Sequence, residues 1–139
     1  QDNLLASAPY APLSEREMEV LKAALNVFLT QSNIRCTTCG YCMPCPYGVD
    51  IPGNFQLFNK YGVLAGDQEK ISTANLSRPA RDFLIQYKNN LPRAARADHC
   101  IRCGKCLHLC PQHLRIPEHL RKIDALAATI DKATGRGTI

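Results

Sequence analysis

The chain has 139 residues, of which 45% are apolar and 21% charged, and a formal net charge of +5 when its histidines are neutral. These values are those of an ordinary globular domain. The basic residues are scattered, without aromatic residues between them, so no nucleic-acid partner is expected. No run reaches the roughly 18 apolar residues that span a bilayer, so no membrane partner is expected either.

Composition directs attention to cysteine. Aromatic residues make up only 6% of the chain, Trp is absent, and eight residues are Cys. The chain begins at Gln1 without the basic and apolar segments of a signal peptide, so we expect a cytoplasmic protein excised from a longer chain. In a reducing cytosol, closely spaced cysteines favour metal binding over disulfides.

The first expected elements are an irregular arm over residues 1–13 and a helix over residues 15–31. Ser14 stands three residues before Glu17, which is the spacing of a capping box. An apolar stripe at helical spacing follows, and we expect it to lie in the core, although part of it could dock another domain. The stripe consists of Met18, Leu21, Leu25 and Phe28.

Three later helices are each expected to begin near a proline, which a first helical turn tolerates. The prolines are Pro52, Pro79 and Pro117, and the expected stops are Gly62 with Gly66, Pro92, and Gly135 with Gly137. The inward residues are expected to be Phe55, Phe58 and Tyr61; Phe83, Leu84 and Tyr87; and Leu120, Ile123, Leu126 and Ile130. A short helical turn over residues 92–97 precedes the second group of cysteines. No alternating strand pattern is visible, so the expected fold class is all-α.

An internal repeat relates the two parts of the chain that contain cysteine. Residues 45–55 and 110–120 both read C-P-x-x-apolar-x-I-P-x-x-apolar, and three cysteines precede each segment. Such a duplication predicts pseudo-two-fold symmetry. We therefore expect a single domain over residues 1–139, with parts at 1–13 (arm), 14–33 (N-terminal helix), 34–66 (first cysteine half), 67–97 (helical insert) and 98–139 (second cysteine half).

The spacing of the cysteines indicates iron–sulfur clusters. The first segment has two residues between each pair of successive cysteines, and the second has two, two and three before a Cys-Pro pair, which is the pattern of bacterial two-cluster proteins. Three cysteines two residues apart let a tight loop wrap one cuboidal cluster. Gly40 and Gly104 allow a positive φ and a close approach of the backbone.

A fourth cysteine in the same tight loop would reach the far corner of its own cluster only with difficulty. In the bacterial pattern the fourth cysteine binds the other cluster. We therefore predict two 4Fe-4S clusters with crossed ligands. The predicted ligands are Cys36, Cys39, Cys42 and Cys110 for cluster 1, and Cys100, Cys103, Cys106 and Cys45 for cluster 2.

Other metals and cofactors fit the sequence less well. Zinc sites use ligand pairs separated by a longer loop, a two-iron cluster suits other spacings, and a redox C-x-x-C pair belongs in a βαβ context. Rieske ligation by His108 and His113 would leave most cysteines without a role, and no C-x-x-C is followed by His as covalent haem requires. The four histidines are expected to be surface groups or to lie next to the cluster ligands without binding iron themselves: His99, His108, His113 and His119.

The positive charge has two interpretations. Clusters bound by thiolates are negative, so the surplus of Arg and Lys can compensate buried negative charge and raise the reduction potential. Arg102 and Lys105 lie inside the second cysteine loop. They are either solvated surface charges or groups that raise the potential of the second cluster or dock a partner.

The runs over residues 36–52 and 100–106, with Cys110-Pro111-Gln112, resemble the C-terminal ferredoxin-like domain of iron–sulfur members of the aldo/keto reductase family. Two positions depart from the family pattern: Thr38 stands where Gly is usual, and Leu107 where Glu is common. The helical insert also resembles the α-helical ferredoxins of fumarate reductase iron–sulfur subunits and dihydropyrimidine dehydrogenases. The resemblance implies an α-helical ferredoxin-like fold.

The same resemblance implies an oxidoreductase parent whose N-terminal (β/α)8 barrel binds a nicotinamide cofactor and reduces a carbonyl. The catalytic residues of that barrel are not in this chain, so no catalytic residue is assigned. We expect an electron-transfer domain that serves the barrel and a redox partner. One alternative is a structural domain that the clusters hold together while it docks a partner, without redox turnover. Another is an independent subunit that docks a flavoprotein.

Overall fold

The computed structural model of the chain describes residue 3 and residues 12–30, 33–61 and 76–135. Contacts divide the chain into two compact units, Gln1–Gln31 and Ser32–Ile139. Across the described ranges the regular elements are helices and no strand is present, which confirms the all-α class. None of the described helices has the length and apolar character needed to cross a bilayer. The single-domain organisation stays a prediction.

Some predicted features lie outside the described residues. These are most of the arm over residues 1–13, the stops at Gly62, Gly66 and Gly137, most of the stretch over residues 67–77, and the side chain of Phe28.

The first unit contains helix α2, Glu15–Thr30, which begins where the capping box predicts. The backbone N–H and the hydroxyl of Ser14 both donate to Glu17 Oε2, at 2.8 and 2.7 Å, and the Glu17 N–H donates to Ser14 Oγ at 3.3 Å. The hydrogen bond from the Ser14 hydroxyl lowers the pKa of Glu17 most, and the bond from the Ser14 N–H lowers it further. The predicted capping box is therefore confirmed.

The apolar stripe of α2 is not part of the hydrophobic core. Met18, Leu21 and Leu25 are 41%, 52% and 53% exposed, and none of them belongs to the buried cluster. The expectation that this stripe lies in the core is therefore wrong. Helical periodicity predicts an apolar face, but it does not say what covers that face, and among the described residues of this unit no other helix packs on α2.

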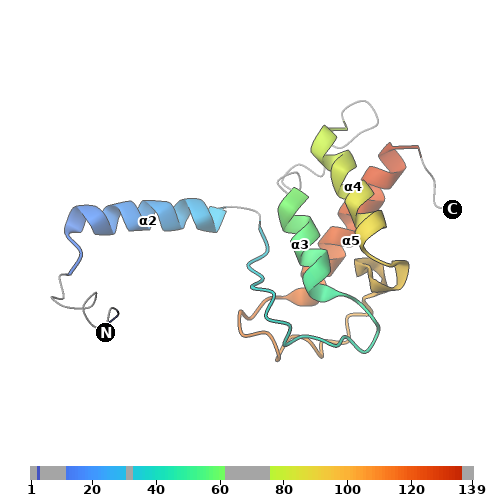
Figure 1. The fold of residues 1–139 in the computed structure, drawn as a ribbon, viewed down its shortest axis with the longest axis horizontal. Helices are drawn as coiled ribbons and strands as arrows, with labels where there is room; N and C mark the ends of the chain where they lie inside the picture. Colours follow the sequence, from blue (N-terminus) through green and yellow to red (C-terminus); the bar gives the residue numbers. More distant parts are fainter. Residues whose placement is uncertain (1–2, 4–11, 31–32, 62–75, 136–139) are drawn as a thin grey trace. The chain divides into compact units, whose positions relative to one another are not determined.

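The second unit is built on three helices that contact one another in every pair: α3 (Ile51–Tyr61), α4 (Arg78–Asn90) and α5 (Ile116–Ala133). In Figure 1, α3 and α5 begin at the end of this unit where the cysteine loops lie, and α4 runs in the opposite direction. Their inward faces form the core as predicted, except that Tyr61 is only partly buried against it. Among its buried residues are Phe55, Phe58, Phe83, Leu84, Tyr87, Leu120, Ile123, Leu126 and Ile130.

Local sequence fixes where α3 and α4 begin. Asp50 Oδ1 accepts from the Gly53 N–H at 3.0 Å, and Ser77 Oγ accepts from the Ala80 N–H at 3.4 Å. Both oxygens satisfy an N–H that has no partner inside the helix. A Cβ on Gly53 would collide with the Asp50 carboxylate, so this cap requires glycine there. A proline lies in the first turn of each helix, as predicted.

Two short 3-10 helices, Arg93–Ala95 and Ala97–His99, connect α4 to the second cysteine loop. The short turn predicted over residues 92–97 therefore exists in this form. Helix α5 ends before Gly135, whose φ of +68° is the left-handed conformation common after a helix.

Candidate metal centre

The two cysteine loops repeat the same backbone conformation. Thr38 and Arg102 have φ values of +55° and +58°, and Gly40 and Gly104 have φ values of +78° and +76°. The positive φ predicted for the two glycines is confirmed. The left-handed conformation at Thr38 and Arg102 was not predicted, and it is unfavourable for residues with a side chain, most of all for a β-branched one.

Backbone hydrogen bonds repeat in the same way from the loops into the helices that follow. In the first half they run from Met43 to Gly40 (2.8 Å), Gly48 to Cys45 (2.9 Å), Ile51 to Val49 (3.1 Å) and Asn54 to Asp50 (3.0 Å). In the second half they run from Leu107 to Gly104 (3.0 Å), His113 to Cys110 (3.0 Å), Ile116 to Leu114 (2.9 Å) and His119 to Arg115 (3.1 Å). The predicted internal repeat is therefore present in the backbone itself.

Two pockets lie against these loops, and cysteines from both halves line each of them. The cysteines of the first pocket are Cys36, Cys39, Cys42 and Cys110. Those of the second pocket are Cys42, Cys45, Cys100, Cys103 and Cys106. The last cysteine of each loop thus lies in the pocket made mainly by the other loop, and Cys42 lines both pockets.

The pKa values of two thiols reflect the same grouping. Partial burial raises the pKa of Cys42, and the neighbouring Cys36, Cys110 and Cys39 raise it further, although a hydrogen bond to its own backbone opposes this. Burial likewise raises the pKa of Cys106 to about 11, with smaller contributions from Cys100, Cys103 and Cys42. Both thiols are therefore protonated near neutral pH until metal binding displaces the proton.

The donor set fits iron–sulfur clusters. All eight cysteines are free of disulfides, and thiolates are the ligands on which such clusters are held. The Thr38 N–H donates to Cys36 Sγ at 3.4 Å, a contact of the kind that tunes cluster potentials. In the described part of the chain, which includes every cysteine, no three His, Cys, Asp or Glu side chains form a site for a single metal ion.

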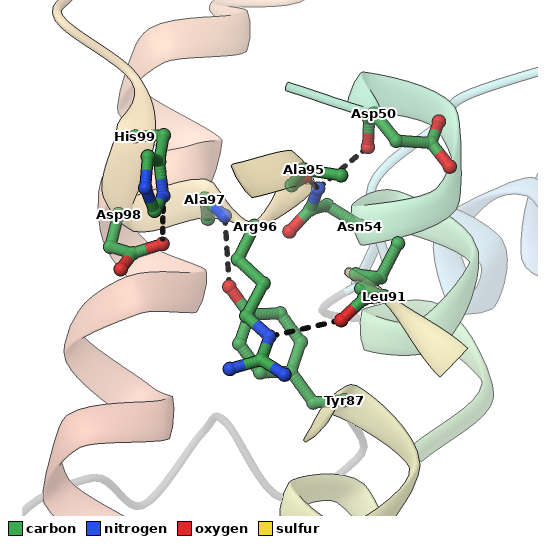
Figure 2. A network of polar contacts seen from close by, with 9 residues as sticks. All are labelled: Asp50, Asn54, Tyr87, Leu91, Ala95, Arg96, Ala97, Asp98 and His99. Atoms are coloured by element: carbon green, nitrogen blue, oxygen red, sulfur yellow. Dashed lines mark hydrogen bonds and ion pairs between the residues drawn. The ribbon is translucent and has the colours of Figure 1, made fainter. Parts of the chain in front are cut away.

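A hydrogen-bonded contact joins helix α3 of the first cysteine half to the end of the helical insert, just before the second cysteine loop. The carbonyl of Ala95 accepts from the Asp50 N–H at 3.0 Å and from Asn54 Nδ2 at 2.9 Å. Figure 2 shows Asp50, Asn54 and Ala95 facing one another. Asn54 is fully buried, and its Nδ2 also donates to Asp50 O. This contact was not predicted, because nothing in the sequence pairs residues 41 positions apart.

The first cysteine loop is held at its entrance in a similar way. Asn59 of α3 accepts from the Ile34 N–H at 2.8 Å and donates to the Ile34 carbonyl at 2.7 Å. Ile34 lies two residues before Cys36. Helix α3 therefore uses Asn59 to fix the start of the first loop and Asn54 to fix the approach to the second.

Tyr87 and Arg96 complete the support of the second loop (Figure 2). The buried Tyr87 hydroxyl accepts from the Ala97 N–H at 2.9 Å, and burial raises the pKa of Tyr87. Arg96 donates to the carbonyls of Leu91 at 3.1 Å and Lys88 at 2.8 Å. It thereby satisfies carbonyls at the end of α4 that lack partners within the helix.

Comparison with known families decides what this arrangement is. The family model of the 4Fe-4S dicluster domain matches residues 35–116, a range that contains every cysteine of the chain. The chain belongs to the 4Fe-4S dicluster domain family. Its cofactors are two 4Fe-4S clusters, as the cysteine spacing predicts. No curated protein and no solved structure matches the chain.

The histidines of this dicluster domain lie apart from the cysteine pockets. None of the four lines either pocket among the described residues. His99 contacts Asp98 at 2.9 Å, and the ring of His119 packs edge-on against Phe55 with 5.8 Å between centroids. Burial lowers the pKa of His119 most, and the positive charge of Lys122 lowers it further. No pattern in the sequence points to the residues that do hold the loops in place.

Proposed function

We propose that this dicluster domain transfers single electrons between a redox partner and a catalytic domain of the same parent chain. Bound iron–sulfur clusters supply one-electron oxidation and reduction. The chain's own residues would hold the clusters in fixed positions, limit their contact with water and set their potentials. No described residue is assigned a role in bond making or breaking.

We propose the crossed ligand sets for the two clusters. Cys110 joins Cys36, Cys39 and Cys42, while Cys45 joins Cys100, Cys103 and Cys106. The single observation that carries this proposal is the lining of the two pockets, in which the last cysteine of each loop accompanies three cysteines of the other loop. Because Cys42 lines both pockets, cluster sites built there would be close neighbours, as electron exchange between them requires.

A redox titration of the anaerobic, cluster-loaded chain tests the proposal. Visible absorbance should bleach reversibly as the potential is lowered, and the reduced protein should give paramagnetic signals from both clusters. A protein whose clusters stay redox-silent over the range of cellular reductants would not be an electron-transfer domain.

The parent protein is proposed to be an aldo/keto reductase-like oxidoreductase with a (β/α)8 barrel. The support is the resemblance of residues 36–52 and 100–112 to the ferredoxin-like domain of that family. The reading frame upstream of the codon for Gln1 provides a direct test. It should encode a barrel of roughly 250 residues. A reading frame that encodes another type of domain would refute the aldo/keto reductase-like parent.

A structural role without redox turnover is the second candidate, and the cysteine loops favour it. Residues 33–50 and 100–115 contain no α-helix, and many of their side chains are exposed. Eight bonds between iron and cysteine sulfur would therefore hold together loops that gain little stability from apolar packing. The same titration distinguishes the candidates, because a structural role predicts stable clusters that do not bleach.

A further inference from the structure

The two cysteine loops have the same backbone but different side chains at equivalent positions. Where the first loop has Thr37, Thr38 and Tyr41, the second has Ile101, Arg102 and Lys105. The repeated φ angles and hydrogen bonds show that these positions correspond in structure as well as in sequence. At these three positions the second loop therefore has an apolar residue and two cations, where the first loop has two threonines and a tyrosine.

The rim of the second pocket is exposed, apolar and basic. Tyr47, Ile101 and Leu109 line this pocket and are 44%, 58% and 44% exposed. Arg102 and Lys105 also line it and are exposed, and neither forms an ion pair with a described residue. We call these five residues the basic rim.

The first pocket has a different surround. No charged residue lines it within the described ranges, and its polar lining residues are Thr37 and Gln112. Among the residues that the structure describes, none that lines the second pocket is acidic. Two cations and three exposed apolar side chains thus gather at one of the two cluster sites.

We propose that the basic rim is the docking surface for an acidic redox protein, whose carboxylates surround its own cofactor. This inference rests on the proposed electron-transfer function and names the partner's chemistry and the cluster that faces it. Charge complementarity chooses the occupant, because two cations at a pocket that no described acidic residue lines attract an acidic patch and speed its approach. Tyr and Arg beside exposed aliphatic groups give the composition of an interface centre with a polar edge.

The position of the rim also suits its purpose. Cys103, one of the proposed ligands of cluster 2, is exposed, as is Cys39 in the first loop; because the basic rim lies only at the second pocket, a partner seated on it would approach cluster 2 closely. Electrons would enter or leave the chain through cluster 2 at this partner, and cluster 1 would exchange electrons with the catalytic domain.

Binding of a defined acidic protein tests the docking surface. The probe is oxidised flavodoxin, an FMN protein with carboxylates around its flavin, titrated into the cluster-loaded full chain. Binding should weaken steeply from about 20 mM to about 300 mM salt, because the attraction is screened. The double variant Arg102→Glu, Lys105→Glu should weaken binding by about tenfold or more, and Ile101→Ser should weaken it less and without changing the salt dependence.

The matched control is Arg81→Glu, Lys132→Glu, which changes the net charge equally. Arg81 lies in the first turns of α4 and Lys132 in the last turn of α5, at the end of the unit opposite to the cysteine loops in Figure 1. This control should bind as the wild type does. If the control loses binding as much as the rim variant, or if the wild type does not bind flavodoxin at low salt, the docking surface is refuted.

Two further outcomes keep the proposal separate from the function on which it rests. Iron content of each variant shows whether the clusters are intact, and Arg102→Gln, Lys105→Gln gives a milder replacement should the Glu variant lose iron. A dimer of the chain that the rim variant dissociates would identify a second copy as the occupant and overturn the acidic partner. If binding depends on the rim but the clusters are redox-silent, the docking surface stands and the electron-transfer function is refuted. If the clusters bleach reversibly but binding does not depend on the rim, electron transfer stands and the docking surface is refuted.

Discussion

Asn54 on α3 donates through Nδ2 to the carbonyl of Ala95 at 2.9 Å, and so joins the first cysteine half to the segment that leads into the second cysteine loop, by a contact that contains no cysteine. The same carbonyl accepts from the Asp50 N–H at 3.0 Å. Asp50 lies five residues after Cys45, and Ala95 five residues before Cys100. The contact therefore holds near each other two segments whose cysteines line the second pocket.

Replacing this amide should destabilise the domain. Asn54→Ala removes both bonds of Nδ2 and leaves the partly buried Asp50 and Ala95 carbonyls with fewer donors, a loss of about 1 to 3 kcal/mol in the free energy of unfolding. The thermal midpoint of the cluster-loaded domain measures it. Asn90→Ala is the matched control, because Asn90 is exposed and bonds only to Gln86 at 2.7 Å among the described residues. Equal midpoints for the two variants would show that the contact is unimportant.

Tyr87→Phe should cost about 1 to 2 kcal/mol at neutral pH, because the buried Ala97 N–H loses its acceptor. Tyr47→Phe, at an exposed tyrosine, should leave the unfolding midpoint unchanged.

Alkaline pH supplies a second test of Tyr87. Burial raises the pKa of this phenol above its ordinary value of 10.0, so the folded state holds the proton more tightly than the unfolded state. Its contribution to stability is complete below about pH 10 and is lost as the pH rises beyond it. The stability advantage of the wild type over Tyr87→Phe should therefore shrink above about pH 10. An advantage that does not change with pH would contradict this role.

Thr38→Gly should stabilise the domain. Thr38 has a φ of +55°, and a left-handed conformation costs a residue with a side chain about 1 to 2 kcal/mol, part of which the greater freedom of glycine in the unfolded chain offsets. We expect a net gain of about 1 kcal/mol in the free energy of unfolding, measured from the shift of the thermal midpoint. Thr37→Gly is the control, because Thr37 is exposed and does not have a positive φ, and it should destabilise the domain by about 0.5 to 1 kcal/mol. If both glycines act alike, strain at Thr38 is not significant.

Pairs of cysteine replacements distinguish crossed from uncrossed ligands. Cys110→Ala alone should lose about half of the iron, because one cluster loses a ligand. Adding Cys36→Ala should change the iron content little, since both ligands belong to the same cluster, whereas adding Cys100→Ala should remove the rest. Uncrossed ligands predict the opposite order, in which Cys100→Ala adds nothing to Cys110→Ala and Cys36→Ala removes the remaining iron.

The sequence predicted those parts of the fold that depend on local or repeated signals. The capping box at Ser14, the prolines that open α3, α4 and α5, and the inward faces of these three helices act within a few residues, and the structure confirms them. The cysteine spacing likewise predicted two 4Fe-4S clusters, which the family match supports.

The remaining features depend on single contacts that follow no periodic or repeated pattern in the sequence. A single Asn, Tyr or Arg has no period, so the hydrogen bonds that Asn54, Tyr87 and Arg96 make near the second cysteine loop have no signature in the chain. The stripe on α2 has the period of a core helix, but periodicity does not reveal what covers a face. The conformation of Thr38 did have a signal, since the resembling family usually has glycine there.

Chemical analysis of the anaerobic, freshly purified chain tests the central claim most directly. Two 4Fe-4S clusters on the eight cysteines predict about eight iron atoms and about eight acid-labile sulfide ions per chain. A full complement of a single metal ion in each cysteine pocket without sulfide, or eight cysteines joined in disulfides, would contradict the account.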